Sequence, residues 1–191
     1  MARSGASAPR LLLLCGPPGS GKTHLLRAIG HVVSHEQPSV AVVQTTADEL
    51  LQQWIAAIAR DEEHGRPWPR AALVTIDDLH TLSGRVLAQR EFARQIAIAS
   101  DRGIRFACTI GRLSDAPALI KAVRRVPRSR VVRLRPPTRT VMSRILAELA
   151  RGEAVALQAS QLRSIAAGCR GDVRRACGAI ARERFLASAR G

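Results

Sequence analysis

Apolar residues along this chain follow two different spacings. Short apolar runs that end at glycine, proline or polar residues are typical of strands buried in a parallel sheet. Such runs occupy about 10–15, 40–44, 71–78, 104–110 and 131–134. Apolar residues three or four positions apart indicate helices. That spacing occurs at about 22–35, 47–60, 84–100, 118–124, 138–150, 160–167 and 173–187. Strands that alternate with helices predict an α/β fold, a parallel sheet flanked by helices.

The pattern also predicts where the chain divides. Residues 1–9 are small and polar and are expected to be disordered. The sheet domain is expected to cover 10–135, because Pro136 and Pro137 follow the last strand. Only helical spacing follows, which predicts a small all-α lid at 138–191.

Local signals add detail to the helices. Thr46 and Glu49 form the pattern of a capping box at the start of the second helix, and Asp172 is placed to cap the last one. Trp68, in a loop at 61–70, is expected to pack into the core rather than to stack on a base.

The first strand leads into a glycine loop. Leu11–Cys15 is followed by the pattern G-x-x-x-x-G-K-T and then by a helical segment. Strand, loop and helix in this order predict a phosphate-binding loop, whose backbone N–H groups surround an anion at a helix N-terminus. Lys22 is expected to contact the β- and γ-phosphates, and the Thr23 hydroxyl to bind Mg²⁺. The predicted nucleotide-binding residues are Gly16, Pro17, Pro18, Gly19, Ser20, Gly21, Lys22, Thr23 and His24.

Two carboxylates follow the third strand. The run at 71–78 ends in Asp77 and Asp78, at the carboxyl edge of the predicted sheet, where open α/β sheets bind their ligands. Asp77 is expected to hold Mg²⁺, and Asp78 to orient or deprotonate the attacking water. The site therefore predicts a nucleoside triphosphate and Mg²⁺ as ligands.

The charge of the chain suggests a second partner. The formal net charge is +15 and the isoelectric point is about 11.6, which favours a polyanion such as DNA. A genome whose base composition favours arginine codons would produce the same excess of positive charge. Aromatic residues make up only 3% of the chain, with no tyrosine, so little surface is expected for stacking on bases.

Cysteines and hydropathy bear on the cellular compartment. The four cysteines lack metal-ligand spacing and are expected to be buried thiols in a reducing cytoplasm. The apolar run at 11–14 is too short for a signal sequence, and no run reaches the length of a membrane span.

In order, these motifs resemble those of the AAA+ ATPases, and among them the bacterial replication initiator DnaA and its Hda-type relatives. The matching segments are G-K-T-H-L-L-R-A-I-G at 21–30, I-D-D-L-H at 76–80, R-S-R at 128–130, R-P-P at 135–137 and G-D-V-R-R at 171–175. The resemblance implies that the strand ending near Thr109 lies between the glycine-loop strand and the Asp77–Asp78 strand.

The resemblance also implies roles for three arginines. Arg130 matches the arginine finger that reaches the γ-phosphate of a neighbouring subunit, with Arg128 as the alternative. Arg174 matches the lid arginine that points back to the phosphates. ATP would bind between core and lid, and slow hydrolysis would require a homo- or hetero-oligomer of AAA+ subunits. Gly111 falls where relatives carry a polar sensor, and Thr109 could replace it.

Three functions remain open at this stage. The chain could be an ATP-dependent assembly switch in replication initiation or its regulation. It could be a helicase loader or transposition helper. It could also be a weakly hydrolysing adaptor that lends an arginine finger to another AAA+ protein.

Overall fold

The computed structural model describes residues 8–59, 68 and 71–189, without the side chains of 57–59. They group into two compact units. Unit 1 comprises Met1–Cys15 and Lys22–Arg133, and unit 2 comprises Gly16–Gly21 and Leu134–Gly191. The predicted loop at 61–70 and the predicted disorder at 1–9 fall mostly outside the described residues.

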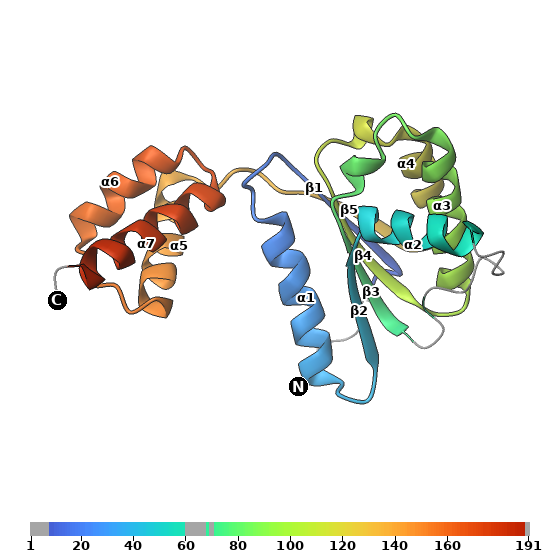
Figure 1. The fold of residues 1–191 in the computed structure, drawn as a ribbon, viewed down its shortest axis with the longest axis horizontal. Coiled ribbons are helices and arrows are strands. Elements are labelled where there is room, and N and C mark those ends of the chain that lie inside the picture. The colour runs from blue at the N-terminus through green and yellow to red at the C-terminus, as the bar shows by residue number, and fades with distance from the viewer. Residues whose placement is uncertain (1–7, 60–67, 69–70, 190–191) are drawn as a thin grey trace. The chain divides into compact units, whose positions relative to one another are not determined.

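Unit 1 contains a five-stranded parallel sheet (Figure 1). Its strands are β1 (Leu11–Cys15), β2 (Ala41–Thr46), β3 (Ala71–Asp77), β4 (Arg105–Ile110) and β5 (Ser129–Arg133). Their order across the sheet is β2-β3-β4-β1-β5. The strand β4 therefore separates β3 from β1, as expected, and the predicted parallel α/β fold is confirmed.

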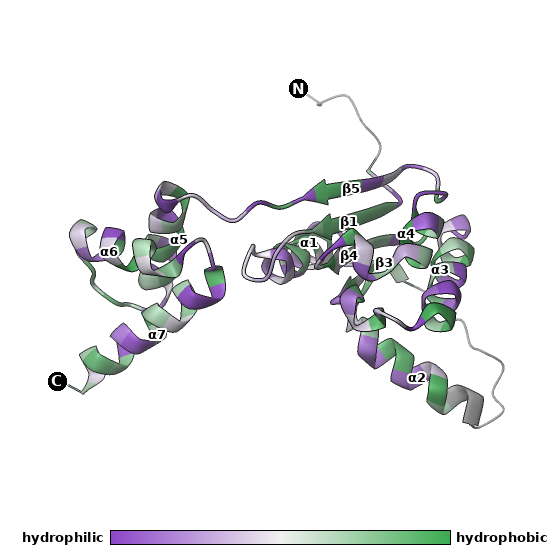
Figure 2. Ribbon diagram, turned by 90° about the horizontal axis from the view of Figure 1, so that it is seen from above, coloured by the Kyte–Doolittle hydropathy of each residue, from purple (hydrophilic) through white to green (hydrophobic). Residues whose placement is uncertain are grey.

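Helices cover both faces of this sheet. They are α1 (Lys22–Glu36), α2 (Ala47–Ala59), α3 (Val86–Asp101) and α4 (Pro117–Val123), with the short 3₁₀ helices η1 (Leu79–Leu82) and η2 (Leu113–Asp115). The larger apolar cluster joins alternate residues of β1, β3 and β4 to α2, α3 and α4. The remaining alternate residues pack on α1. The two faces are both buried, which is why β1 is hydrophobic along its whole length in Figure 2.

The two outer strands differ from the sequence prediction. The segment at 40–44 was expected to be a buried strand, but β2 is the sheet edge, is only partly buried and extends to Thr46. The other edge strand, β5, begins at Ser129 rather than at Val131, because β1 supplies backbone partners for Ser129 and Arg130. The two 3₁₀ helices were not predicted, because one turn is too short to show a period.

Local capping and packing predictions are confirmed. The Thr46 hydroxyl accepts a hydrogen bond from the Glu49 N–H, and the Glu49 carboxylate accepts one from the Thr46 N–H, at 3.1 and 2.8 Å. Hydrogen bonds from that N–H and from the Thr45 hydroxyl lower the pKa of Glu49. Trp68 is buried and packs edge-on against Phe106, with ring centroids 5.2 Å apart.

Unit 2 is built on three helices, α5 (Arg139–Gly152), α6 (Ala159–Cys169) and α7 (Val173–Ser188). Their buried faces form a separate apolar core around Met142, Leu146, Ala176 and Ile180. The Asp172 carboxylate caps α7 by accepting a hydrogen bond from the Arg174 N–H at 2.8 Å, as predicted.

The cysteines only partly match their prediction. Cys15, Cys108 and Cys169 are buried, but Cys177 is exposed on α7, because helical spacing turns that position outward. Burial raises the pKa of Cys108 to about 12. No helix in the described part of the chain is long and apolar enough to cross a bilayer.

Candidate functional site

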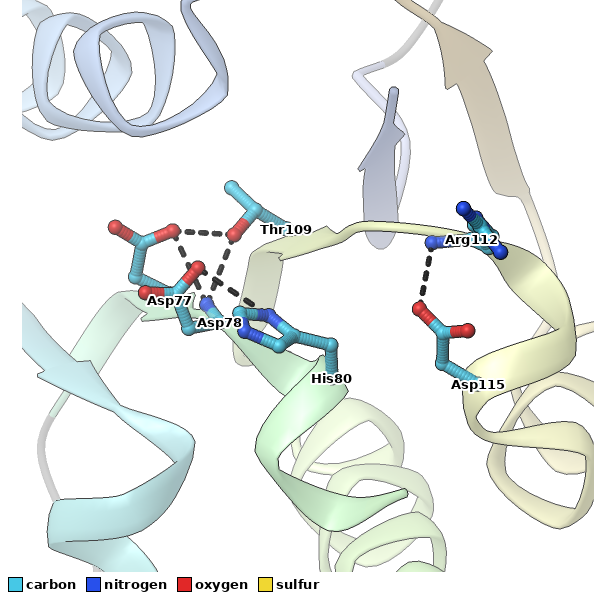
Figure 3. Close-up of polar contacts among 6 residues, drawn as sticks. All are labelled: Asp77, Asp78, His80, Thr109, Arg112 and Asp115. Atoms are coloured by element: carbon cyan, nitrogen blue, oxygen red, sulfur yellow. Dashed lines mark hydrogen bonds and ion pairs between the residues drawn. The ribbon is translucent and has the colours of Figure 1, made fainter. Parts of the chain in front are cut away.

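The two predicted acidic residues meet Thr109 at the carboxyl ends of neighbouring strands (Figure 3). Asp77 is the last residue of β3, and Thr109 is the penultimate residue of β4. The Thr109 hydroxyl donates a short hydrogen bond to Asp77 Oδ1 and accepts one from the Asp78 N–H at 2.9 Å. Thr109 is fully buried, so its side chain is held in this arrangement.

Asp78 has an unusual backbone conformation. Its φ of 59° and ψ of 47° lie in the left-handed region, which aspartate tolerates better than most residues. The hydrogen bonds of its N–H to Thr109 and to Asp77 Oδ1, the latter 3.1 Å long, hold that conformation. Such conformations concentrate at functional sites, where the surroundings determine them. The backbone at Asp78 therefore bends away from the direction of β3 at the edge of the sheet.

His80 lies beside this pair. Its Nδ1 is 3.5 Å from Asp78 Oδ1, and both side chains are partly exposed. Sequence reasoning assigned His80 no role, and only its position two residues after the aspartate could have drawn attention to it.

The glycine loop has the conformations that its sequence predicts. Gly19 and Gly21 have φ of 72° and 87°, the left-handed region that favours glycine. The Gly19 carbonyl accepts a hydrogen bond from the Val173 N–H at 2.8 Å. A Cβ at Gly16 would lie 2.6 Å from the Leu134 carbonyl oxygen, so that position too requires glycine.

The start of α1 follows the loop directly. Lys22 and Thr23 are the first two residues of the helix and are partly buried, whereas His24 is exposed. Pro17 and Pro18 are also exposed, and the Ser20 hydroxyl is buried without a hydrogen-bond partner. Backbone N–H groups at a helix start, a lysine and a hydroxyl are a donor set that fits a phosphate group.

A polar cavity adjoins Asp77. Its volume is about 180 Å³, and its walls include Thr46, Thr75, Arg27 and Glu49. Hydroxyl and carboxylate oxygens are ligands that suit Mg²⁺ and its water shell. Asp77 is therefore one oxygen ligand for the predicted metal ion, although the described residues contain no cluster of three or more His, Cys, Asp or Glu side chains that could hold a metal.

The position after β4 explains why a glycine stands where a polar sensor was expected. Gly111 precedes η2, where Asp115 Oδ2 accepts a hydrogen bond from the Arg112 N–H at 2.9 Å (Figure 3). A Cβ at Gly111 would lie 3.2 Å from that carboxylate oxygen. The side chain that reaches the aspartates is that of Thr109.

The three predicted arginines do not join this cluster by any hydrogen bond or ion pair between described residues. Arg130 is exposed on β5 and pairs with Leu12, near the amino end of the strands. Arg128 has a φ of 60° and donates to the Ala8 carbonyl at 3.4 Å. Arg174 is exposed in the first turn of α7.

Comparisons with known proteins agree with these features. The profile of the family described as "Bacterial DnaA ATPase domain" matches residues 2–130. A chromosomal replication initiator protein DnaA from Acinetobacter baylyi is 32% identical over 110 residues. That alignment covers 51% of this chain but only 24% of the relative, so the chain corresponds to a part of it.

Solved structures show the same fold. Domain III of the Thermotoga maritima initiation protein DnaA superposes with a TM-score of 0.81 at 24% identity, covering 90% of this chain and 74% of that one. A replication initiator DnaA bound to AMPPCP and single-stranded DNA superposes at 0.74 and 20% identity, covering 89% and 53%.

Proposed function

We propose that this chain, which belongs to the family of bacterial DnaA ATPase domains, binds ATP with Mg²⁺ and hydrolyses it slowly, in an assembly with another AAA+ subunit. The observation that carries the proposal is the hydrogen-bonded group of Asp77, Asp78 and Thr109, at the same edge of the sheet as Cys15, the end of β1 after which the glycine loop follows in the sequence. A phosphate loop alone indicates only nucleotide binding. An ordered pair of carboxylates indicates hydrolysis.

The proposed roles follow from the chemistry of each group. The loop N–H groups and Lys22 bind the β- and γ-phosphates, and Thr23 and Asp77 hold Mg²⁺, which neutralises charge on the phosphates when bound. Asp78 orients the attacking water and accepts its proton as the bond from the water oxygen to the γ-phosphorus forms and the bond to the β–γ bridging oxygen breaks, which releases ADP and phosphate. Thr109 keeps both aspartates in place.

The location of Arg130 favours a role in another subunit. It lies toward the amino end of the sheet strands, whereas Asp77 and Asp78 lie at the carboxyl end of the same sheet. Arg130 therefore serves the nucleotide of a neighbour, where a planar, permanently charged guanidinium stabilises the transferred phosphoryl group. Arg174 would act on the nucleotide of its own chain.

The remaining parts of the proposal concern the biological role. DNA is the second partner, supported by the net charge of +15 and by a relative whose structure contains single-stranded DNA. ATP then acts as an assembly switch in replication initiation or its regulation, in the cytoplasm. A helicase loader, or an adaptor that hydrolyses ATP only weakly, would share the fold. The rate of ATP turnover distinguishes the adaptor from the other two functions.

The test is ATP turnover as a function of protein concentration, with and without single-stranded DNA. The expected result is turnover that rises more than linearly with concentration in the parent chain. Lys22→Ala, Asp78→Asn and Arg130→Ala should each lower turnover at least tenfold. Arg133→Ala is the matched control, because Arg133 is an exposed arginine on the same strand, facing the opposite side of the sheet.

Two outcomes would change the proposal. Normal turnover in Arg130→Ala would remove the arginine finger from that position. Tight ATP binding without turnover at any concentration would exclude the ATPase and favour the adaptor.

A further inference from the structure

We infer that the amino edge of the sheet in unit 1 binds the backbone of a nucleic acid. This edge lies opposite to Asp77 and Asp78. Parallel strands begin, and the helices that precede them end, at this same edge. Six arginines lie around the starts of β4, β1 and β5 and the ends of α3 and α4. These residues, called the basic edge below, are Arg10, Arg102, Arg105, Arg124, Arg125 and Arg128.

The connections of the chain hold these arginines together. The Arg10 guanidinium donates to the Ser100 carbonyl at 2.9 Å, which joins the start of β1 to the end of α3. The Phe106 N–H donates to the Arg10 carbonyl at 2.8 Å, next to Arg105. Arg128 donates to the Ala8 carbonyl. The segments that carry the arginines are therefore tied to one another by direct contacts.

Most of this positive charge faces solvent. Arg102, Arg124, Arg125 and Arg128 are exposed, and Arg10 and Arg105 are partly exposed. No ion pair between described residues includes any of the six. Among the described residues at these strand starts and helix ends, the carboxylate beside them is Asp101, the last residue of α3.

Helix dipoles account for only part of this charge. Arginines at helix C-termini stabilise the partial negative charge there, about half a unit for each helix. The ends of α3 and α4 together with Asp101 therefore offset about 2 of the 6 positive charges. For the described residues, about 4 positive charges therefore remain for a polyanion, more than helix capping requires.

The chemistry of the edge specifies the kind of contact. Guanidinium groups form two parallel hydrogen bonds to a phosphate. The aromatic residues described in unit 1, Trp54, Trp68, Phe92 and Phe106, are buried, so none can stack on a base there. The basic edge therefore binds the phosphodiester backbone without base preference. It also binds independently of ATP, because the nucleotide residues of unit 1 lie at the opposite edge.

This inference rests on the proposed function, which includes a nucleic-acid partner, and it adds the surface that binds that partner. The test is fluorescence anisotropy with a labelled 25-nucleotide oligothymidylate, and with a duplex of the same length, over a series of salt concentrations. The variant is the triple substitution Arg102→Gln, Arg105→Gln and Arg124→Gln. The matched control is Arg144→Gln, Arg163→Gln and Arg182→Gln, three exposed arginines of unit 2. Both lower the net charge by three, from +15 to +12.

The triple variant should lower the salt slope for oligothymidylate by about 2, since each phosphate contact on a single strand contributes about 0.7. The control should change it by less than half as much. Asp101→Asn should bind about two- to threefold more tightly, which tests the surface even if the triple variant folds poorly. At a fixed Mg²⁺ concentration, and at protein concentrations where the chain does not self-associate, affinity for the oligonucleotide should be the same with and without ATP.

Other outcomes overturn the inference in distinguishable ways. Equal losses in both triple variants would mean a diffuse attraction without a site. Loss of self-association in sedimentation, with oligonucleotide binding intact, would make the basic edge a subunit interface. A parent chain that binds neither oligonucleotide would refute the nucleic-acid partner itself. ATP turnover, measured on the same variants, tests the ATPase separately.

Discussion

At the scale of single residues, one hydroxyl organises the site. Thr109 has one proton to donate, which goes to Asp77, and its oxygen accepts the Asp78 N–H. Without it, the Asp78 N–H would keep only its 3.1 Å hydrogen bond to Asp77 Oδ1, and that oxygen would lose one of its two donors. Loss of a buried hydrogen-bond partner costs about 1–3 kcal/mol.

Thr109→Val removes this hydroxyl at nearly constant shape. We expect ATP turnover to fall at least tenfold while the affinity for ATP changes less than threefold, since the glycine loop is untouched. Single-turnover hydrolysis and nucleotide titration measure the two effects. Ser100→Ala is the control, because the Ser100 hydroxyl is buried without a hydrogen-bond partner among the described residues, near the end of α3, at the edge of the sheet opposite to Asp77. Equal losses in both variants would show that the fold, rather than the aspartate pair, is damaged.

At the scale of elements, the start of α2 depends on the reciprocal cap of Thr46 and Glu49. Hydrogen bonds lower the pKa of Glu49 below its ordinary value of 4.5. A carboxyl with a lowered folded-state pKa stabilises the fold fully above its unfolded pKa, and the contribution disappears as the pH falls through the folded value. The cap should therefore weaken below about pH 4.5.

Thr46→Ala should lower the free energy of unfolding by about 1 kcal/mol at pH 7. Glu49→Gln, which cannot ionise, should differ from the parent above about pH 4.5 and less below it, whereas the Thr46→Ala difference should change little with pH, because residue 46 keeps the N–H that donates to Glu49. Urea unfolding at several pH values measures both. Gln52→Ala, at an exposed position later in α2, should have little effect. A Glu49→Gln effect that stays constant down to pH 3 would argue against the Glu49 contribution.

The sequence predicts the position of some elements more accurately than that of others. The capping residues of α2 and α7 and the glycine loop depend on neighbours within four positions, so their patterns were sufficient. The edge strands were less well placed. A strand end depends on which backbone lies beside it, and the pairing of β5 with β1 extends the strand to Ser129 and includes Arg130.

At the scale of the whole molecule, the two ends of the sheet in unit 1 differ in chemistry. The carboxyl edge bears Asp77 and Asp78, and the amino edge bears the six arginines of the basic edge. The proposed nucleic-acid backbone would therefore bind at the edge of this sheet opposite to Asp77 and Asp78.

Binding of ATP should stabilise the whole chain. A ligand at 100 times its dissociation constant adds about 2.7 kcal/mol to the free energy of unfolding. For a protein of this size that is about 5–10 °C in the midpoint of thermal unfolding. Scanning calorimetry with ATP and Mg²⁺ measures it. Lys22→Ala should abolish the shift. An unchanged shift in that variant would mean that the nucleotide binds elsewhere.

The sequence by itself determined the features that rest on local spacing: the alternation of strands and helices, the glycine loop, the aspartate pair and the helix caps. Only the tertiary structure decided what depends on residues far apart. Thr109 meets Asp77 across 32 positions because β4 pairs with β3. Arg10 lies beside Ser100 because β1 pairs with β4. The physical reason is that parallel strands collect distant segments at shared edges, and no short-range pattern records which strands are neighbours.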